Sequence, residues 1–549
     1  MPFTRCLAAI LLANFGSLVV LNLFCLPTGQ TVPVYALSLA AAFVSLRPVC
    51  WRRVPALGDR LVWLMAAAAV VLLTLPRLPY LLEWLPSTYV KTAFDDFARL
   101  AELVAMTLSP QYPLHHPGNA ELPFSFYYAA LYPMAVLKLA LPVLTLKDAV
   151  FAVNLLYHVL VLGSLVEVAR LLLRDKRAVR VLLALVFLFG GFDWLMHGRF
   201  FPPGNPEWWQ AAAPFYGNTQ ISSFYISIFF VVHHFLGFYA VVIAYVVLFY
   251  SRISPKWLKP ALVLLLLCSA FYSSVFAFMS VPLFALVHRR VIWRRLVRTP
   301  VFPVVCSAAC VPLFLYLGKF SGQALVASTF RIRFTDWFVL DKVLSLPVFV
   351  LLVPLVEFGG IPLVILLVYR RLSATARRYF AVAAAFFLLT YVVAYSQSNN
   401  LSMRGMLLPT FVCFVIFARY WRDLADWFGA HVWRGRWFFR TGAVMVMCGG
   451  VFGTLYETAA MVLWSGATCS LSYELLEIPP PQWVGLLRRV DSRRIARDPS
   501  VTRLPPRLVP PEQRRVLFNA ETLLEPIAPE EMVEWERELA RQPREGFFR

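Results

Sequence analysis

Two adjacent carboxylates, Asp95 and Asp96, stand in the longest polar interruption of the first 460 residues. The stretch that follows them is amphipathic, and its apolar face holds Leu100, Leu103, Val104 and Leu108. A carboxylate beside a bound hydroxyl group can act as a general base, and a helix N-terminus would keep it ionised. The alternative is that one of the two only caps the helix that follows, since Asp is a preferred N-cap residue. If the pair is catalytic, we favour Asp95, the first residue after Phe94, as the base.

Six further ionisable residues stand in or beside apolar runs, and we expect them to bind substrate. They are Asp193, His233, His234, Arg331, Arg333 and Arg404. Ionisable groups within apolar runs usually face the protein interior or a polar cavity, and the planar fork of Arg suits phosphate oxygens. Structural roles remain open for all of them: buried, hydrogen-bonded imidazoles for the histidines, and lipid-headgroup or carboxylate contacts for the arginines.

The composition indicates a polytopic membrane protein. Hydrophobic residues make up 60% of the 549 residues, and the mean hydropathy is +0.68. Apolar runs long enough to cross a bilayer recur along the chain. The net charge of +21 does not point to nucleic acid, because residues 465–549 hold 13 Arg and 13 acidic residues and are neutral. The excess lies in short loops between apolar runs, as in cytoplasmic loops of membrane proteins.

We predict an all-α fold with about 13 spans. Their approximate ranges are 6–26, 33–49, 60–79, 148–173, 179–197, 223–250, two short spans within 257–289, 300–318, 345–370, 379–395, 403–421 and 441–463. The run 124–145 is apolar enough to span, but counting it would place the basic cluster 174–180 outside. We therefore predict that 124–145 forms helices lying on the outer face.

This topology places the N-terminus in the cytoplasm and the C-terminus outside. It predicts an N-terminal hairpin at 1–59, a catalytic membrane domain at 60–464 with an external acidic loop at 80–146, and a small external segment at 465–549. The predominance of Arg over Lys and the abundance of Ala, Leu and Pro favour a bacterial inner-membrane protein.

Several common chemistries lack support in the sequence. It has no Gly-rich phosphate loop, no HExxH and no GxSxG, so cytosolic nucleotide-driven and common hydrolase activities are not indicated. The nine cysteines show no CxxC pair and no zinc spacing. We expect no cofactor and no dedicated metal site, although use of a divalent metal remains open.

The pattern resembles the GT-C class of membrane glycosyltransferases, which includes protein O-mannosyltransferases and aminoarabinose transferases. Those enzymes carry an acidic motif in the first large external loop and often a second one after the next outward span. Phe94-Asp-Asp-Phe97 matches the first motif and Gly191-Phe-Asp193 the second, and the segment 122–133 followed by 147–150 resembles the helix and re-entry after the loop. The similarity covers roughly residues 60–420. Two extra spans before the acidic loop and the lack of a WWD-type signature argue against an oligosaccharyltransferase proper.

The resemblance implies an inverting enzyme that transfers a sugar from a polyprenyl-phosphate donor to a lipid, glycan or protein acceptor on the outer face of the membrane. Two other functions stay open. One is a surface-polysaccharide polymerase or ligase that relies on external Arg and His side chains. The other is a transporter or flippase of lipid-linked sugar, although the internal repeats typical of transporters are not evident. In each case membrane lipids are partners and nucleic acid is not.

Overall fold

The structure is a computed structural model, and it describes the greater part of the first 477 residues. The long described ranges are 1–47, 59–75, 128–144, 146–173, 175–190, 223–230, 232–250, 357–395 and 404–477. Shorter described stretches lie at residue 49, between 103 and 123, between 265 and 290, at 330–332 and between 350 and 355. All statements below concern these residues.

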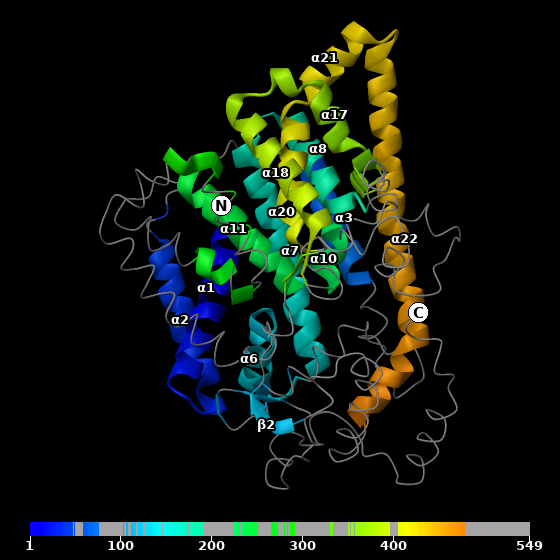
Figure 1. Cartoon of the computed structure of the whole chain (residues 1–549). Coiled ribbons are helices and arrows are strands. Elements are labelled where there is room, and N and C mark those ends of the chain that lie inside the picture. Colours follow the sequence, from blue (N-terminus) through cyan, green and yellow to red (C-terminus); the bar gives the residue numbers. More distant parts are fainter. Residues whose placement is uncertain are drawn as a thin grey trace.

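The described chain is mostly helical, as the sequence predicts (Figure 1). The α-helices are α1 (Pro2–Leu23), α2 (Thr31–Leu46), α3 (Arg60–Thr74), α6 (Tyr132–Ala140), α7 (Leu146–Leu172), α8 (Lys176–Leu188), α10 (Phe224–Phe230), α11 (Val232–Tyr250), α17 (Ile361–Leu367), α18 (Ala374–Val392), α20 (Leu407–Arg419), α21 (Trp421–His431) and α22 (Gly435–Glu477). Three short 3-10 helices are η1 (Thr28–Gln30), η3 (Tyr128–Ala130) and η6 (Tyr369–Arg371).

Four short strands depart from a purely helical fold. They form two antiparallel pairs, β1 (His115–His116) with β2 (Asn119–Pro123), and β3 (Phe330–Ile332) with β4 (Val393–Tyr395). Both pairs lie in segments that the sequence predicts as external loops or as the end of a span, where backbone groups need partners outside a helix.

Five helices in the described ranges are long and apolar enough to cross a bilayer. These stretches are Pro2–Leu23, Thr28–Leu46, Asp148–Leu172, Val232–Tyr250 and Gly435–Tyr456. Two shorter apolar helices, α3 and α20, coincide with further predicted spans. Several long apolar helices are thus present, and the total of 13 spans remains a prediction.

The boundaries differ from the predicted ones at several places. The run 223–250, predicted as one span, is helical over Phe224–Phe230 (α10) and Val232–Tyr250 (α11), and residue 231 between them lies outside the described residues. Within the predicted span 345–370, Gly359 and Gly360 have positive φ angles, and α17 begins only after them. The helix α22 has 43 residues and continues through the proposed domain boundary at 464/465. At 1.5 Å per residue it is about 65 Å long, roughly twice the thickness of a bilayer core.

The segment 124–145 contains no long helix in its described part. There η3 has three residues and α6 has nine, whereas a spanning helix needs about 20. The location of this segment on the outer face of the membrane stays a prediction. Figure 1 shows α6 and β2 together at one end of the bundle, and we call this the loop end.

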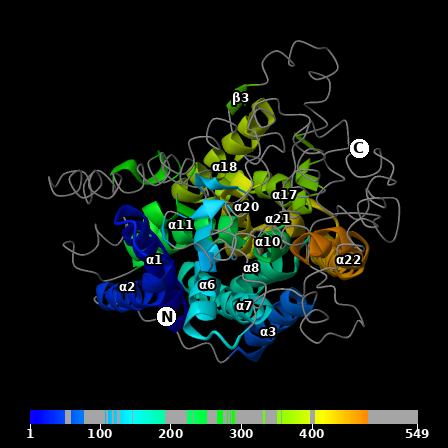
Figure 2. The same cartoon turned by 90° about the horizontal axis from the view of Figure 1, so that it is seen from below.

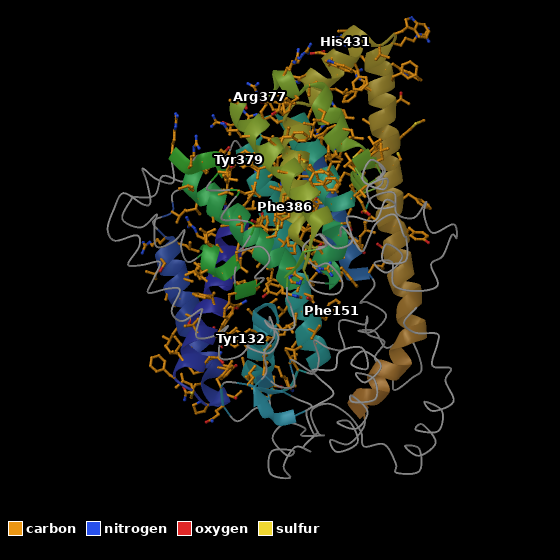
Figure 3. The ribbon with its side chains drawn as sticks, in the orientation of Figure 1. Tyr132, Phe151, Arg377, Tyr379, Phe386 and His431 are labelled. Atoms are coloured by element: carbon orange, nitrogen blue, oxygen red, sulfur yellow. The ribbon has the colours of Figure 1, made fainter. Side chains whose placement is uncertain are left out.

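The opposite end of the bundle carries α21 and the starts of α8 and α18, and we call it the basic end (Figure 1). Two contacts join its elements. Arg422 forms an ion pair with Asp175 at 3.4 Å, and the backbone N–H of Ser373 donates to the Tyr420 hydroxyl at 2.8 Å. In Figure 3, Arg377 and His431 lie toward this end, whereas Tyr132 and Phe151 lie toward the loop end. The predicted cytoplasmic clusters around residues 174–180, 377–378 and 419–440 therefore gather on one side of the bundle.

The core is a continuous apolar cluster centred on α1, α7, α8, α11 and α20. Helix α1 packs against α2 and α7, α8 packs against α20, and α3 packs against both α7 and α8. Seen from the loop end, α1 and α2 lie on one side of the bundle and α22 on the opposite side, with α6, α7 and α8 between them (Figure 2).

Candidate functional site

The predicted site residues divide into two groups. Asp95, Asp96, Asp193 and Arg333 lie outside the described residues. The structure describes His233, His234 and Arg404 in full, and the backbone of Arg331. The described part of the candidate site therefore consists of His233, His234, Arg404 and the backbone of Arg331, together with the segments that lead toward the other four residues.

The two histidines are the second and third residues of α11. His233 is buried and His234 is partly buried, and their ring centroids lie 4.1 Å apart. The sequence places them about ten residues inside the predicted span 223–250, and the structure places them at the second and third residues of α11, just after residue 231, which lies outside the described residues.

An aromatic cluster fixes α10, α11 and α20 against one another. The ring of Phe224 in α10 lies 5.7 Å from Phe238 in α11 and 6.3 Å from Phe411 in α20, and Phe238 and Phe411 are 5.6 Å apart. Phe238 comes one helical turn after His234, so the two project from the same side of α11. The cluster therefore ties the start of α11, with its histidine pair, to α20.

Arg404 is buried and lies three residues before α20 begins at Leu407. A buried guanidinium is costly unless other groups compensate its charge. Because Arg404 is buried, we expect a binding or structural role for its charge. Arg404 lies just before α20, and Phe411 of α20 packs against Phe224 of α10 and Phe238 of α11.

The pairing of β3 with β4 brings a second arginine-bearing segment to this region. Arg331 in β3 lies opposite Ala394 in β4, and β4 follows directly from α18. The chain then continues from Tyr395 to Arg404, so Arg331 and Arg404 flank the same α18–α20 connection. Figure 2 shows β3 beside α18 as seen from the loop end. These two arginines are more than 70 residues apart in sequence, and the strand pairing places β3 beside the start of the connection that leads to Arg404.

The segment that leads to Asp193 is held by α22. The backbone N–H of Gly190 donates to the Gly450 carbonyl at 3.0 Å, and Thr454 Oγ1 donates to the Leu188 carbonyl at 3.0 Å. A Cβ atom on Gly190 would lie 2.6 Å from the Thr454 nitrogen, so this close approach needs glycine. These contacts hold the chain against α22 immediately before the Gly191-Phe-Asp193 motif.

The predicted external loop, 80–146, which includes Asp95 and Asp96, is attached through its later residues to the N-terminal hairpin α1–α2. The Tyr112 N–H donates to the Leu26 carbonyl at 2.9 Å, and Gln111 forms a β-bridge with Pro27. The Tyr112 hydroxyl lies 3.4 Å from Thr31 Oγ1. Contacts to the turn between α1 and α2 thus hold residues 111–112 of the loop.

A buried polar network holds the later part of the same loop. Asn14 Nδ2 in α1 donates to the Ala129 carbonyl at 3.1 Å and to the Tyr272 hydroxyl at 2.6 Å. Tyr157 in α7 donates to the Ala130 carbonyl at 3.0 Å. Both carbonyls belong to η3, where the loop returns to the bundle. We call Asn14, Tyr157 and Tyr272 the Asn14 network.

Sequence reasoning did not single out the Asn14 network. The available signal was Asn14 itself, because a side-chain amide within a long apolar run usually has a partner on another helix. The expected apolar face of the amphipathic stretch is confirmed at Leu103, which is buried in the core. Leu100, Val104 and Leu108 lie outside the described residues.

Within the described ranges, no three His, Cys, Asp or Glu side chains come close enough to form a metal-binding group. The chemistry that the described residues offer is imidazole and guanidinium chemistry, which means hydrogen bonding, proton transfer and anion binding. No family model matches the chain, and neither a curated protein nor a solved structure matches it.

Proposed function

We propose that the protein is an integral membrane glycosyltransferase that transfers a sugar from a polyprenyl-phosphate donor to an acceptor on the outer face of a bacterial inner membrane. In this proposal the basic end of the bundle faces the cytoplasm and the loop end faces outward. The enzyme is of the inverting type, and the acceptor is a lipid, a glycan or a protein.

One observation supports the proposal most. The segments of Arg331 and Arg404 flank a single connection, and the aromatic cluster ties α20, the helix after Arg404, to α11, which carries His233 and His234. Guanidinium groups suit the phosphate of a lipid-linked donor, which becomes the leaving group. The loop that carries Asp95 and Asp96 is anchored to the same bundle further along the chain, through Tyr112. The segment that leads into Asp193 is anchored through Gly190.

The proposed reaction is a single displacement. Asp95, or Asp96, accepts the proton from the acceptor hydroxyl, and the resulting oxygen nucleophile attacks the anomeric carbon of the sugar. The bond between that carbon and the phosphate oxygen breaks, and the polyprenyl phosphate leaves with the electron pair, held by the arginines. Configuration at the anomeric carbon inverts because attack and departure occur on opposite faces. Asp193, His233 and His234 bind the substrates.

Asn variants of the acidic pair test the general base. A positioned base typically contributes about 10²–10⁴-fold in rate. Asp95→Asn or Asp96→Asn should therefore lower sugar transfer by about that factor while the protein stays folded and membrane-inserted. A residue that only caps a helix would instead show nearly unchanged transfer and a loss of stability of about 1 kcal/mol or less. Wild-type transfer by both single variants would exclude a catalytic role for the pair.

Arginine variants test donor binding. Arg331→Lys, Arg333→Lys and Arg404→Lys each keep the charge but remove the planar fork. At least one should raise the KM for the lipid-linked donor without raising the KM for the acceptor. Unchanged donor KM in all three variants would remove phosphate binding by these residues from the proposal.

A surface-polysaccharide polymerase or ligase is the second candidate, and the close pair of the buried His233 and the partly buried His234, on a helix that packs against α20, favours it. Such an enzyme would rely on Arg and His side chains. Its signature would be loss of activity in His233→Gln or Arg404→Lys together with full activity in both Asn variants. A lipid-linked-sugar flippase would move its lipid across vesicles without forming a new glycosidic bond.

A further inference from the structure

Residues 432–440 comprise the connection after α21 (432–434) and the first residues of α22 (435–440); we call them the α21–α22 turn, and they form a surface at the basic end. Arg434 adopts a positive φ of 54°, and a Cβ atom on the next residue, Gly435, would overlap the Phe428 carbonyl oxygen. Phe439 is buried and packs on Trp421 at 4.8 Å and on Phe428 at 5.1 Å. These contacts fold the start of α22 back onto α21 and fix the directions of the remaining side chains of the turn.

Three large aromatic side chains point away from the protein at this turn. Trp433 is 76% exposed, Trp437 is 59% exposed and Phe438 is 48% exposed. Trp433 and Trp437 are four residues apart, and Trp side chains collect where a helix leaves the bilayer core. The stretch of α22 that is apolar enough to span begins at Gly435, between these two tryptophans. If α22 crosses the bilayer from Gly435 onward, the turn lies at the depth of the lipid headgroups.

The charges of the turn are basic only. Residues 432–440 hold Arg434, Arg436 and Arg440 and no acidic residue. Arg436 forms an ion pair with Asp426 at 3.0 Å. Arg434 lies over the ring of Trp433 at 4.5 Å, and neither Arg434 nor Arg440 pairs with a carboxylate in the described part of the chain. Two exposed guanidinium groups thus stand among exposed aromatic rings.

We propose that this turn binds the headgroups of anionic phospholipids. Arg434 and Arg440 contact phosphate oxygens, which the guanidinium fork suits. The rings of Trp433, Trp437 and Phe438 insert between headgroups and the first acyl-chain carbons. The excess of positive charge selects lipids with a net negative charge over zwitterionic ones. This inference is independent of the proposed enzymatic activity.

Native mass spectrometry of the delipidated full-length protein, titrated with phosphatidylglycerol or phosphatidylcholine, tests the proposal. The wild type should retain phosphatidylglycerol more tightly than phosphatidylcholine. Removing both charges in Arg434→Gln/Arg440→Gln should weaken phosphatidylglycerol binding by about 10- to 30-fold and leave phosphatidylcholine binding nearly unchanged. Trp433→Ala/Trp437→Ala keeps the charges and should weaken the binding of both lipids.

The matched control is Arg377→Gln/Arg378→Gln. These two arginines are also exposed and lie in the first turns of α18, but the described residues next to them include no exposed Trp. The control should keep wild-type lipid preference, with folding of all variants verified by size-exclusion chromatography and melting temperature. An equal loss in the control would mean that total charge, and not this turn, selects the lipid. That result, or unchanged preference in Arg434→Gln/Arg440→Gln, would overturn the proposal.

Discussion

The carboxylate of Glu167 accepts a hydrogen bond from the backbone N–H of Thr4 at 2.9 Å. The same carboxylate accepts from Thr4 Oγ1 at 2.8 Å and from the Phe3 N–H at 3.3 Å. Glu167 lies in α7 and is buried, so a side chain of one helix satisfies the first free N–H groups of another. A negative charge at a helix N-terminus is favourable, which explains how a buried carboxylate is tolerated here.

Glu167→Leu should destabilise the protein markedly. It leaves buried N–H groups at the start of α1 without acceptors, which costs about 1–3 kcal/mol. Thermal unfolding in detergent measures the loss. In a double-mutant cycle with Thr4→Val, the two changes should be clearly non-additive, because both remove the same contact. Additive effects would show that the two side chains stabilise the fold independently.

The Asn14 network should control the local stability of the external loop. Asn14→Leu removes the donor to Ala129, and we expect faster amide hydrogen exchange in peptides covering residues 111–112 and 128–132. Tyr225→Phe is the matched control, since its hydroxyl contacts Thr458 and the Leu72 carbonyl, away from the loop. Equal exchange at the loop in both variants would mean that the network has no special effect there.

Activity gives the second measure of the same variants. If the loop carries the general base, Asn14→Leu should lower kcat more than it raises KM, whereas Tyr225→Phe should change neither. Faster loop exchange without any change in kcat would keep the structural attachment and count against the proposed catalytic role of the loop.

The ion pair of Asp59 with Arg180 should make stability depend on pH in the acid range. Arg180 Nε donates to Asp59 Oδ2 at 2.7 Å, and Nη2 donates to Oδ1 at 3.0 Å. The hydrogen bond from Arg180 lowers the pKa of Asp59 below its ordinary value of 3.8. A carboxylate whose pKa is depressed on folding adds stability above its unfolded pKa and loses it as the pH falls through the folded pKa.

Melting temperatures of wild type and Asp59→Asn between pH 7 and pH 3 measure this contribution. The wild type should be more stable at neutral pH, and the difference should shrink once the pH falls below about 4. A difference that stays constant over this range would show that ionisation of Asp59 does not contribute.

The contact of Gly190 with α22 predicts opposite effects for two Gly→Ala changes. Gly190→Ala inserts a methyl group against the backbone of Thr454 and should cost about 1–3 kcal/mol. Gly442→Ala lies within α22, where a Cβ atom would have no neighbour within 4 Å. It should be neutral or stabilising by up to about 1 kcal/mol, because Ala favours helix over Gly. Similar melting temperatures for both variants would contradict the close approach at Gly190.

The sequence by itself determined the class of the protein and the order of many of its elements. Long apolar runs must form helices in a bilayer, because unpaired backbone groups are too costly there. This is why α1, α2, α3 and α7 begin and end within a few residues of the predicted spans. The distribution of arginines also predicted that the clusters around 174–180 and 377–378 share one end of the bundle. The same charge pattern is the basis for the prediction that 124–145 lies on the outer face.

Tertiary structure decided the relationships between distant segments. The pairing of Arg331 with Ala394 and the reach of Asn14 to Ala129 depend on contacts separated by more than 60 residues, which no local pattern encodes. The packing of Phe224 on Phe238 and Phe411 likewise joins α10, α11 and α20, and Phe224 and Phe411 lie far apart in the sequence. Hydropathy reports only how apolar a run is. Which side chains meet, and where an apolar run breaks, is decided by how the helices pack.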